Sequence, residues 1–264
     1  MKLCRFQHLG DTEAKIQFGI ANPEQRRVYT LNNTNSHSYS FDQIRLLAPA
    51  QPGKIVCVGL NYSGHLLDGY SRPEQPLIFL KPASAATGPD SQIPFPEQSQ
   101  QIDFEGELGL VIAKTAYQIT PDQVAAHILG YCCGNDVTAR DIQNREQSPT
   151  RAKSFTGFAP FGPWLETDFD PHNFQLRTWL NGQLKQSVSS DELLFSIPEL
   201  VSFISQIMPL DSGDLILTGT PRGMGPMQPG DEVVVEISGI GSLCNRLGPR
   251  SGATLLTEQE LRCG

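Results

Sequence analysis

The stretch QIDFEGELGLVIA, residues 101–113, combines the apolar pattern of a β-strand with three carboxylates, Asp103, Glu105 and Glu107. Side chains of a strand alternate between its faces, so the three acids should project to one side, about 7 Å apart from one to the next. They could face water at the edge of an antiparallel sheet, which is ordinary. Alternatively they hold a cation, because neighbouring ionised carboxylates repel one another. Oxygen ligands favour magnesium, manganese or calcium over zinc.

A second acidic segment, GYCCGNDVTARDIQ (130–143), favours the cation site. It begins as an apolar strand, and Asp136 follows at the expected strand end, where sheet-built sites commonly place ligands or catalytic side chains. The alternative is an aspartate that caps the next helix. Taken together with Glu105 and Glu107, Asp136 predicts a site of three carboxylates.

Length and composition limit the class of protein. The 264 residues suffice for one large domain, or for one domain with a small appendage. A formal net charge of -8 argues against nucleic acid or an anionic membrane as a partner. No apolar run approaches the roughly 20 residues of a membrane-spanning helix, and the first residues lack the apolar core of a secretory signal. The six cysteines form no C-x-x-C pair, so we expect a cytoplasmic protein with reduced thiols.

The pattern of strands, turns and helices predicts an α+β fold dominated by strands. Residues 1–50 should form a small N-terminal unit that ends at the turn signal APAQPG, and residues 51–264 should form the main domain. The dipeptide NG at 181–182 predicts a two-residue hairpin turn. Helices are predicted to begin after Thr120 and Ser196, each with a glutamine or glutamate three residues later that completes a capping box.

Seven sequence blocks extend this pattern along the chain: GLNYSGH (59–65), LIFLKPASAATGP (77–89), DFEGELGLVI (103–112), GYCCGNDVTARDIQ (130–143), KSFTGFAPFGP (153–163), LTGTPRGMGP (217–226) and GDEVVVEISGIGSL (230–243). In this order they resemble the motifs of the fumarylacetoacetate hydrolase family. The resemblance covers about residues 54–247. It implies a mixed β-sandwich roll like the C-terminal domain of that family, usually a homodimer, that binds Mg²⁺ or Mn²⁺.

The resemblance also implies which residues bind the metal. Two glutamates and an aspartate do so in the family, and the matching positions here are Glu105, Glu107 and Asp136. Asp103 lies on the same predicted face, and we assign it to a place behind the metal ligands or to solvent.

Other polar residues extend the expected site. Lys153 matches the family's lysine beside the metal, where an ammonium could stabilise an enolate or oxyanion, and Gln143 matches a glutamine that can hydrogen-bond a substrate oxygen. Thr220 offers a hydroxyl to a substrate carboxylate, with a simple turn as the alternative; a nucleotide P-loop is not supported. Arg72 is a candidate for a distal substrate carboxylate, with a solvated loop arginine as the alternative. Lys81, which closes an apolar strand, is expected in solvent and is left out of the site.

The segment SGHLLDGY (63–70) supplies a candidate general base. His65 and Asp68 are three residues apart and share a face if the segment forms helical turns, so the carboxylate could orient the imidazole. The alternative is a surface histidine with a local ion pair. In the resembled family a histidine and a glutamate at this spacing lie on a mobile lid, and this chain carries Asp68 where glutamate is usual.

These residues suit a small 2-oxo acid as substrate, because its carboxylate and keto oxygens can chelate a metal in a five-membered ring. We expect carbon–carbon bond cleavage of the acylpyruvate hydrolase or oxaloacetate decarboxylase type, through an enolate. The alternative enzyme is a tautomerase or isomerase of 2-oxo acids, for example an oxaloacetate keto-enol tautomerase or a hydroxy-dienedioate isomerase. It would need proton transfer at His65 but no activated water. A non-catalytic metal-binding protein is the third hypothesis, and it is disfavoured by the retention of His65, Lys153 and the three carboxylates.

Overall fold

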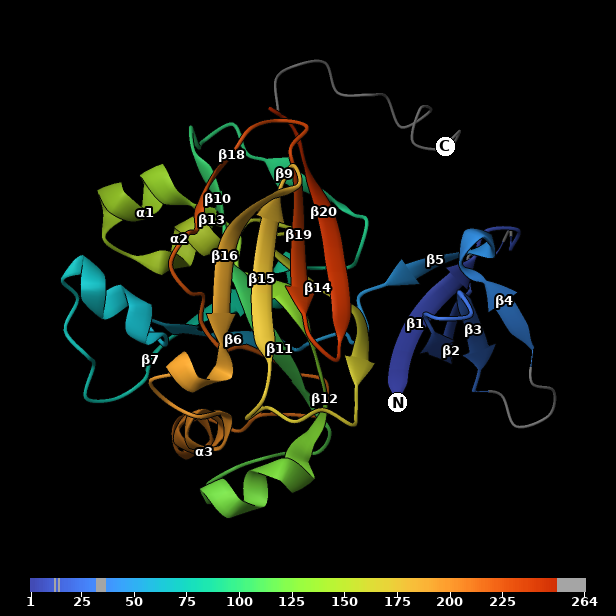
Figure 1. Ribbon diagram of the computed structural model, residues 1–264, viewed down its shortest axis with the longest axis horizontal. Coiled ribbons are helices and arrows are strands. Elements are labelled where there is room, and N and C mark those ends of the chain that lie inside the picture. Colours follow the sequence, from blue (N-terminus) through green and yellow to red (C-terminus); the bar gives the residue numbers. More distant parts are fainter. Residues whose placement is uncertain (12, 14, 32–36, 251–264) are drawn as a thin grey trace.

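The computed structural model describes residues 1–250 except 12, 14 and 32–36, and most of its regular structure is β-strand (Figure 1). The largest sheet has 12 strands and is mixed, because β17 and β6 are parallel neighbours. Its main path is β4 (Ser38–Ser40), β3 (Arg27–Thr30), β2 (Ile16–Asn22), β1 (Lys2–His8), β14 (Ala159–Glu166), β12 (Ile128–Asn135), β11 (Gly106–Ile112), β17 (Leu215–Leu217), β6 (Lys54–Gly59) and β7 (Leu77–Pro82). Off this path, β5 (Ile44–Leu47) pairs with β1, and β8 (Ala86–Thr87) pairs with β14.

Two smaller sheets and a few short helices complete the described fold. One sheet has the order β16 (Gln183–Ser189), β15 (Gln175–Leu180), β19 (Glu232–Ile237), β20 (Gly241–Arg250) and β9 (Gln92–Phe95), and the other β13 (Thr138–Ala139), β10 (Ile102–Phe104) and β18 (Gly225–Met227). The α-helices are α1 (Arg140–Glu146), α2 (Pro149–Lys153) and α3 (Ile197–Ile207). The 3-10 helices are η1 (Phe41–Gln43), η2 (Ser63–Asp68), η3 (Ala83–Ala85), η4 (Pro121–His127) and η5 (Ser190–Glu192). The expected strand-rich fold with few helices is therefore confirmed.

The core explains why β11 has no solvent-facing side. Leu108 and Leu110 of β11 pack in one apolar cluster with Leu176 of β15 and Val235 of β19, which joins the largest sheet to the five-stranded sheet. Val111, on the opposite face of β11, belongs to a second cluster that includes residues of β6 and β17. Because both faces are covered, every residue of β11 is buried. The side chain of Glu107, the acidic residue of β11, therefore lies inside the protein.

The opening stretch is not one strand, as its alternation predicts, but two. β10 ends at Phe104 and β11 begins at Gly106, and Glu105 lies at the break. β10 pairs with β13 and β18, whereas β11 pairs with β12 and β17. Glycine is required at 106 because an added Cβ would lie 2.0 Å from Thr178 Oγ1 on β15. The change of sheet at Glu105 therefore accompanies a close approach of β15 to the acidic segment.

Local turn and cap signals predicted their elements well. Asn181 and Gly182 have positive φ of 49° and 75° between β15 and β16, which confirms the hairpin. α3 is capped by Ser196, whose side chain accepts from the N–H of Glu199, and this confirms the second predicted helix. The segment after Thr120 has the predicted capping box but forms the 3-10 helix η4 rather than an α-helix.

The first five strands are joined to the rest of the sheet by backbone pairing. They form a group at one side of the molecule (Figure 1), and β1 pairs with β2, β5 and β14. Lys2 of β1 donates to Glu166 of β14 at 2.7 Å. A division into units at residue 50 stays a prediction.

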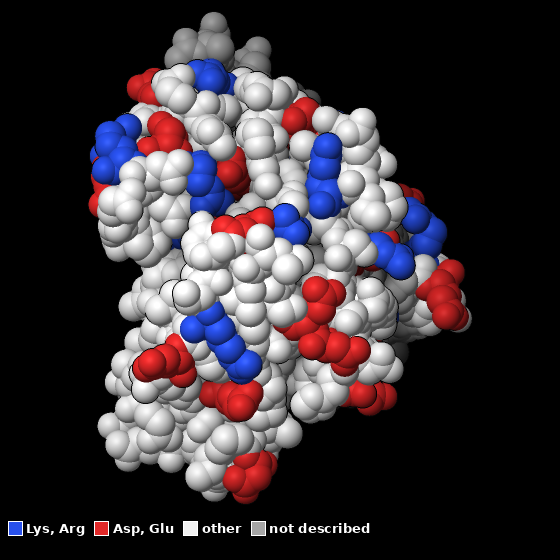
Figure 2. All heavy atoms as spheres, turned by 60° about the vertical axis from the view of Figure 1, so that its left-hand side comes forward, with Lys and Arg blue, Asp and Glu red and all other residues white. Residues whose placement is uncertain are grey.

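On the face that Figure 2 shows, Lys and Arg side chains are scattered among Asp and Glu rather than gathered in one basic patch. None of the helices in the described residues has the length and apolar character that crossing a membrane requires.

The contact of Lys2 with Glu166 predicts a pH-dependent contribution to stability. Burial opposes ionisation of Glu166, but hydrogen bonds from Lys2, from the Met1 ammonium and from the N–H of Asp168 outweigh it and lower the pKa of the carboxyl. Such a group stabilises the fold above its unfolded pKa, near 4.5, and the contribution is lost as the pH falls through the lower folded pKa. Glu166→Gln should therefore reduce the free energy of unfolding by about 1 kcal/mol at neutral pH and by much less at pH ~3.

Urea denaturation at the two pH values measures this difference. Glu232→Gln is the matched control, because Glu232 forms an exposed ion pair with Arg246 and should change stability little at either pH. A loss for Glu166→Gln that is the same at both pH values would contradict the assignment.

Candidate metal centre and active site

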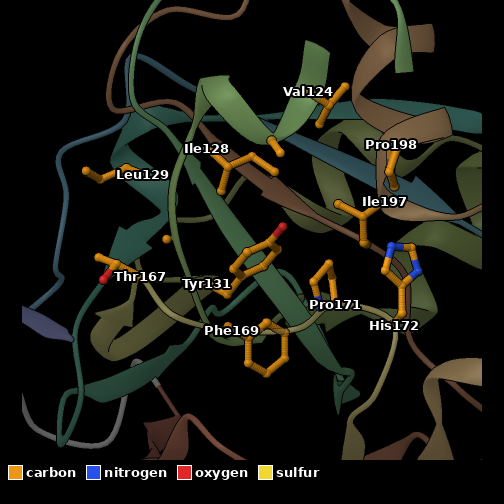
Figure 3. A pocket seen from close by; sticks show the side chains of 12 residues that line it. Val124, Ile128, Leu129, Tyr131, Thr167, Phe169, Pro171, His172, Ile197 and Pro198 are labelled. Atoms are coloured by element: carbon orange, nitrogen blue, oxygen red, sulfur yellow. The ribbon is translucent and has the colours of Figure 1, made fainter. Parts of the chain in front are cut away.

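Two cavities of similar volume are candidates for the functional site. The first, with a volume of about 280 cubic ångströms, lies near the start of β12, and Figure 3 shows its mostly apolar wall. Its polar side chains are those of Tyr131, Thr167 and His172, and no carboxylate is among its described lining residues. The second has a volume of about 250 cubic ångströms. It is lined by Val58, Gly59, Leu60, His65, Tyr70, Phe79, Glu105, Glu107, Asp136, Arg140, Gln143, Lys153, Thr220 and Met224. The second cavity therefore holds the chemistry that the sequence predicts.

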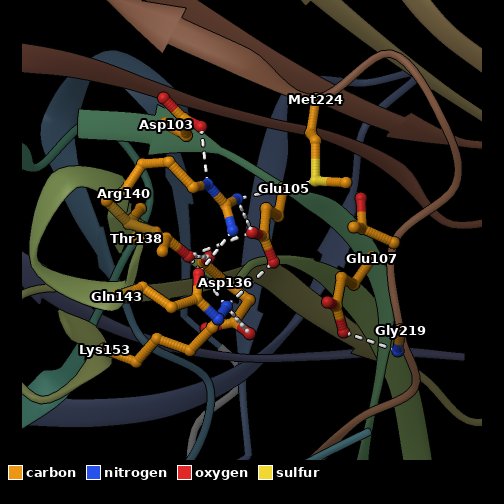
Figure 4. Close-up of polar contacts among 12 residues, drawn as sticks. Asp103, Glu105, Glu107, Asp136, Thr138, Arg140, Gln143, Lys153, Gly219 and Met224 are labelled. Carbon is orange, nitrogen blue, oxygen red and sulfur yellow. Dashed lines mark hydrogen bonds and ion pairs between the residues drawn. The ribbon is translucent and has the colours of Figure 1, made fainter. Parts of the chain in front are cut away.

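The three predicted metal ligands all line this cavity, and Figure 4 shows their side chains. Glu105 lies at the break between β10 and β11, Glu107 lies in β11, and Asp136 directly follows β12. The antiparallel register of β11 and β12 pairs Glu107 with Gly134, which brings the acids together. One carboxylate oxygen of each lies within 4.8 Å of the others, and all three residues are buried.

Lys153, the last residue of α2, lies among these acids. Its Nζ donates to Glu105 Oε2 at 2.9 Å, to Asp136 Oδ2 at 2.6 Å and to Thr138 Oγ1 at 2.7 Å. Burial alone would lower the pKa of Lys153, but the charges of Asp136 and Glu105 raise it, so the lysine is held as an ammonium. Lys153 is thus placed beside the metal ligands, where the family resemblance puts it.

Lys81 is buried, whereas the sequence predicted a solvated lysine at a strand end. Its side chain is fully buried under Asp136, with which it forms an ion pair, and it also donates to the carbonyls of Val137 at 3.1 Å and Phe158 at 2.6 Å. Asp136 is therefore held between two lysines. They overcome the effect of burial and lower the pKa of its carboxyl.

Arg140, the first residue of α1, was also missed by the sequence reasoning. Its Nε donates to Asp103 Oδ2 at 2.8 Å, and its guanidinium also forms an ion pair with Glu105. Asp103 is buried behind the acids rather than in solvent. The signal that could have found Arg140 is its place four residues after Asp136, just beyond the expected strand end.

Glu107 differs from the other acids because the described residues give it no ion pair. Its Oε2 accepts from the N–H of Gly219 at 2.7 Å. Burial, followed by the charges of Asp136 and Glu105, raises the pKa of Glu107 well above its ordinary value. A divalent cation would relieve this repulsion, and three carboxylate oxygens are the donors that Mg²⁺ and Mn²⁺ prefer. The residues present fit a divalent-metal centre of Glu105, Glu107 and Asp136.

His65 is buried in η2 with its ring against the 218–221 loop. Nε2 lies 2.8 Å from the carbonyl oxygen of Thr220. Because a carbonyl only accepts, Nε2 carries a proton, and in the neutral ring Nδ1 is left with the basic lone pair. The predicted orientation of His65 by Asp68 is wrong for this structure. Asp68 instead forms an ion pair with Arg222 at 2.7 Å, and the Thr220 carbonyl orients the imidazole.

The remaining predicted site residues divide into two groups. Gln143 and Thr220 line the cavity. Gln143 accepts from Arg140, and the Thr220 hydroxyl donates to Gly106 O at 2.9 Å and accepts from Gln186 at 2.8 Å. Arg72 does not line it: this exposed side chain donates to the Leu194 carbonyl at 3.0 Å. The candidate role of Arg72 in binding substrate is therefore corrected to that of a loop arginine.

Comparison with known proteins agrees with the fold and identifies the family. A family model described as fumarylacetoacetate (FAA) hydrolase C-terminal matches residues 54–248. The protein Rv2993c of Mycobacterium tuberculosis is 45% identical over 212 residues, which are 79% of this chain and 80% of that protein. A Xenopus laevis protein named mitochondrial oxaloacetate tautomerase fahd2 is 37% identical over 81% of this chain and 71% of its own length. The crystal structure of 5-carboxymethyl-2-hydroxymuconate delta-isomerase from Mycobacterium smegmatis superposes with a TM-score of 0.88 at 38% identity, covering 96% of this chain and all of that one.

The metal centre predicts opposite effects of one substitution with and without metal. Glu107→Gln should leave the metal-free protein at least as stable as the parent, because a buried charge without a cation is removed. It should greatly weaken Mn²⁺ binding, because a ligand is lost. The parent should gain about 2.7 kcal/mol when Mn²⁺ is present at 100 times its dissociation constant. Thermal unfolding with and without Mn²⁺, with the exposed Glu236→Gln as control, measures both effects. If Mn²⁺ stabilised Glu107→Gln as much as the parent, Glu107 would not be a metal ligand.

The buried position of Lys81 predicts a large loss of stability on its removal. Lys81→Met keeps a side chain of similar length but leaves Asp136 with one cation fewer, which should cost about 3–5 kcal/mol. Lys185→Met, at an exposed lysine of β16, should stay within about 0.5 kcal/mol of the parent. Chemical denaturation of both variants gives the comparison, and similar stabilities would show that Asp136 does not need Lys81.

Proposed function

Because this chain belongs to the fumarylacetoacetate hydrolase family, we propose that it is a divalent-metal-dependent enzyme that cleaves a carbon–carbon bond of a small 2-oxo acid. The reaction would be of the acylpyruvate hydrolase or oxaloacetate decarboxylase type. One observation carries the proposal: a single cavity of about 250 cubic ångströms is lined by the three buried carboxylates, Lys153 and His65. The carboxylates suit metal chelation, the Lys153 ammonium suits stabilisation of negative charge, and the His65 imidazole suits proton transfer.

Glu105, Glu107 and Asp136 would hold Mg²⁺ or Mn²⁺ in this cavity. When bound, such an ion supplies Lewis acidity, which draws electron density from the carbon beside the keto group of a 2-oxo acid. Lys153 lies next to the same acids and supplies a fixed positive charge for the negative charge that develops on the substrate oxygens. Gln143 lies one turn after Arg140 in α1, and its Oε1 accepts from that guanidinium. Its amide N–H groups would then donate to a substrate oxygen at the cavity wall.

His65 supplies the base. The Thr220 carbonyl fixes the proton on Nε2, so that Nδ1 can take a proton from water or from the substrate. Burial of the ring limits competition from bulk water. Thr220 thereby acts through its backbone, and its hydroxyl joins Gly106 to Gln186 rather than remaining free for the substrate.

Tautomerisation or isomerisation of a 2-oxo acid is the second candidate. The names of two relatives favour it, an oxaloacetate tautomerase at 37% identity and a delta-isomerase at 38% identity. These reactions need His65 to move a proton but need no nucleophilic water. Turnover of oxaloacetate and of an acylpyruvate, each followed with and without Mg²⁺, separates the two candidates from each other and from a non-catalytic metal-binding protein. We further propose that the enzyme is a homodimer, as the family resemblance implies, and that it is cytoplasmic, as the cysteine pattern predicts.

Substitutions at two residues should separate hydrolysis from decarboxylation. His65→Ala should lower hydrolysis of an acylpyruvate by about 10²–10⁴-fold, because water loses its base, and should affect oxaloacetate decarboxylation far less. Lys153→Ala should lower both activities, because both develop negative charge beside its ammonium. The measurement is kcat/KM for the two substrates at saturating metal, with thermal unfolding of each variant as the control for folding. Equal losses for both substrates in His65→Ala would show that the histidine serves a step common to both reactions.

A further inference from the structure

The charged side chains along the wall of the cavity of about 250 cubic ångströms are unevenly placed. Among the described lining residues, the lysine and arginine side chains are those of Lys153 and Arg140. Both lie at the carboxylate cluster, where Arg140 contacts Glu105 and Lys153 contacts Glu105 and Asp136. From this distribution we infer that the substrate carries one carboxylate and that its opposite end is small and uncharged. The inference rests on the proposed function and narrows its substrate class to acylpyruvates, because oxaloacetate carries a second carboxylate.

The two cations are already satisfied by protein groups. An ammonium has three N–H donors, and Lys153 meets three acceptors, on Glu105, Asp136 and Thr138. Arg140 donates to Asp103, Glu105 and Gln143. Little of its donor capacity is left, and what is left lies close to the metal ligands. A carboxylate at the far end of a substrate would therefore meet neither cation.

The rest of the described wall carries no lysine or arginine, and its apolar side chains are interspersed with the polar side chains of His65, Tyr70, Gln143 and Thr220. It includes the side chains of Val58, Leu60, Phe79 and Met224, and Tyr70 contributes its ring beside His65. A carboxylate placed there would lose part of its hydration without meeting a lysine or arginine, which is unfavourable. An alkyl or acyl group placed there would lose only its unfavourable contact with water.

Two nearby arginines could have received a second carboxylate, but their contacts direct them elsewhere. Arg72 donates to the Leu194 carbonyl, with its guanidinium 6.0 Å from the Phe195 ring. Arg222 pairs with Asp68 at 2.7 Å. Neither is among the residues lining the cavity.

The net charge of the cluster agrees with a singly charged substrate. Four carboxylates meet three cations in it, namely Asp103, Glu105, Glu107 and Asp136 with Lys81, Arg140 and Lys153. One negative charge is left over, so a bound divalent ion would bring the cluster to one positive charge. A monoanion neutralises that charge, whereas a dianion leaves one of its charges uncompensated.

Two stable 2-oxo acids of matched shape test the inference without turnover. 2-Oxoglutarate ends in a carboxylate, and 5-methyl-2-oxohexanoate carries an isopropyl group in its place. Titration calorimetry with the full chain at saturating Mg²⁺ should show at least tenfold tighter binding of the uncharged analogue, a difference of about 1.4 kcal/mol.

Two substitutions test the residues involved. Tyr70→Lys adds a cation to the lining and should shift the preference toward 2-oxoglutarate, whereas the control Tyr70→Leu should not. Arg72→Gln should leave the affinity ratio of the two acids unchanged, because this arginine faces away from the cavity. A fall in 2-oxoglutarate affinity alone in Arg72→Gln would show that Arg72 binds the distal carboxylate and would overturn the inference.

The outcomes distinguish this inference from the proposed function. Equal or tighter binding of 2-oxoglutarate by the parent protein overturns the inference and leaves a metal-dependent 2-oxo acid enzyme in place. Binding of neither acid by protein that binds Mg²⁺ overturns the proposed function and the inference with it. Tighter binding of the uncharged analogue, reduced or reversed by Tyr70→Lys, supports both.

Discussion

Carboxylates buried together must be neutralised, because an unpaired ion inside a protein costs several kcal/mol. Here the cations come from three separate elements: Lys81 from β7, Arg140 from α1 and Lys153 from α2. Each holds its own element against the acids, and Lys153 bridges Glu105 and Asp136. The ion pairs thus connect β7, α1 and α2 to the acidic cluster. Glu107 alone lacks a cation among the described residues, which makes the cluster receptive to a divalent ion.

The position of the base depends on a chain of neutral hydrogen bonds. Gln186, on the β15–β16 hairpin, accepts from the N–H of Gly106 and donates to the Thr220 hydroxyl and the Pro221 carbonyl. It thereby ties the acidic segment to the loop whose carbonyl holds His65. Both functional groups of its amide are used, and the side chain is buried. The metal ligands and the histidine are thus positioned from a common support in the five-stranded sheet.

Sequence reasoning succeeded where a local pattern carries the information. The spacing of Glu105 and Glu107 predicted that their carboxylates lie close together, although Glu105 lies at a break between two strands. The strand-end position of Asp136 and the turn at Asn181 also depend on neighbours within a few residues, and both have their expected places. It failed for Lys81, which ends a strand as a solvated lysine would. Its burial is decided by Asp136, which is 55 residues away. It failed likewise for the partner of Asp68, because no local pattern reveals the approach of Arg222.

The long separations along the chain also bear on when this cluster can form. Lys81 and Asp136 are 55 residues apart, Glu107 and Gly219 are 112 apart, and His65 and Thr220 are 155 apart. Closing loops of this length costs chain entropy before any contact is gained. An incomplete chain that has not yet reached the 218–220 loop can neither bond Glu107 to Gly219 nor hold His65 in place. During synthesis the acids must therefore stay hydrated until most of the polypeptide has emerged, so the capacity to bind a metal tightly arises late in folding.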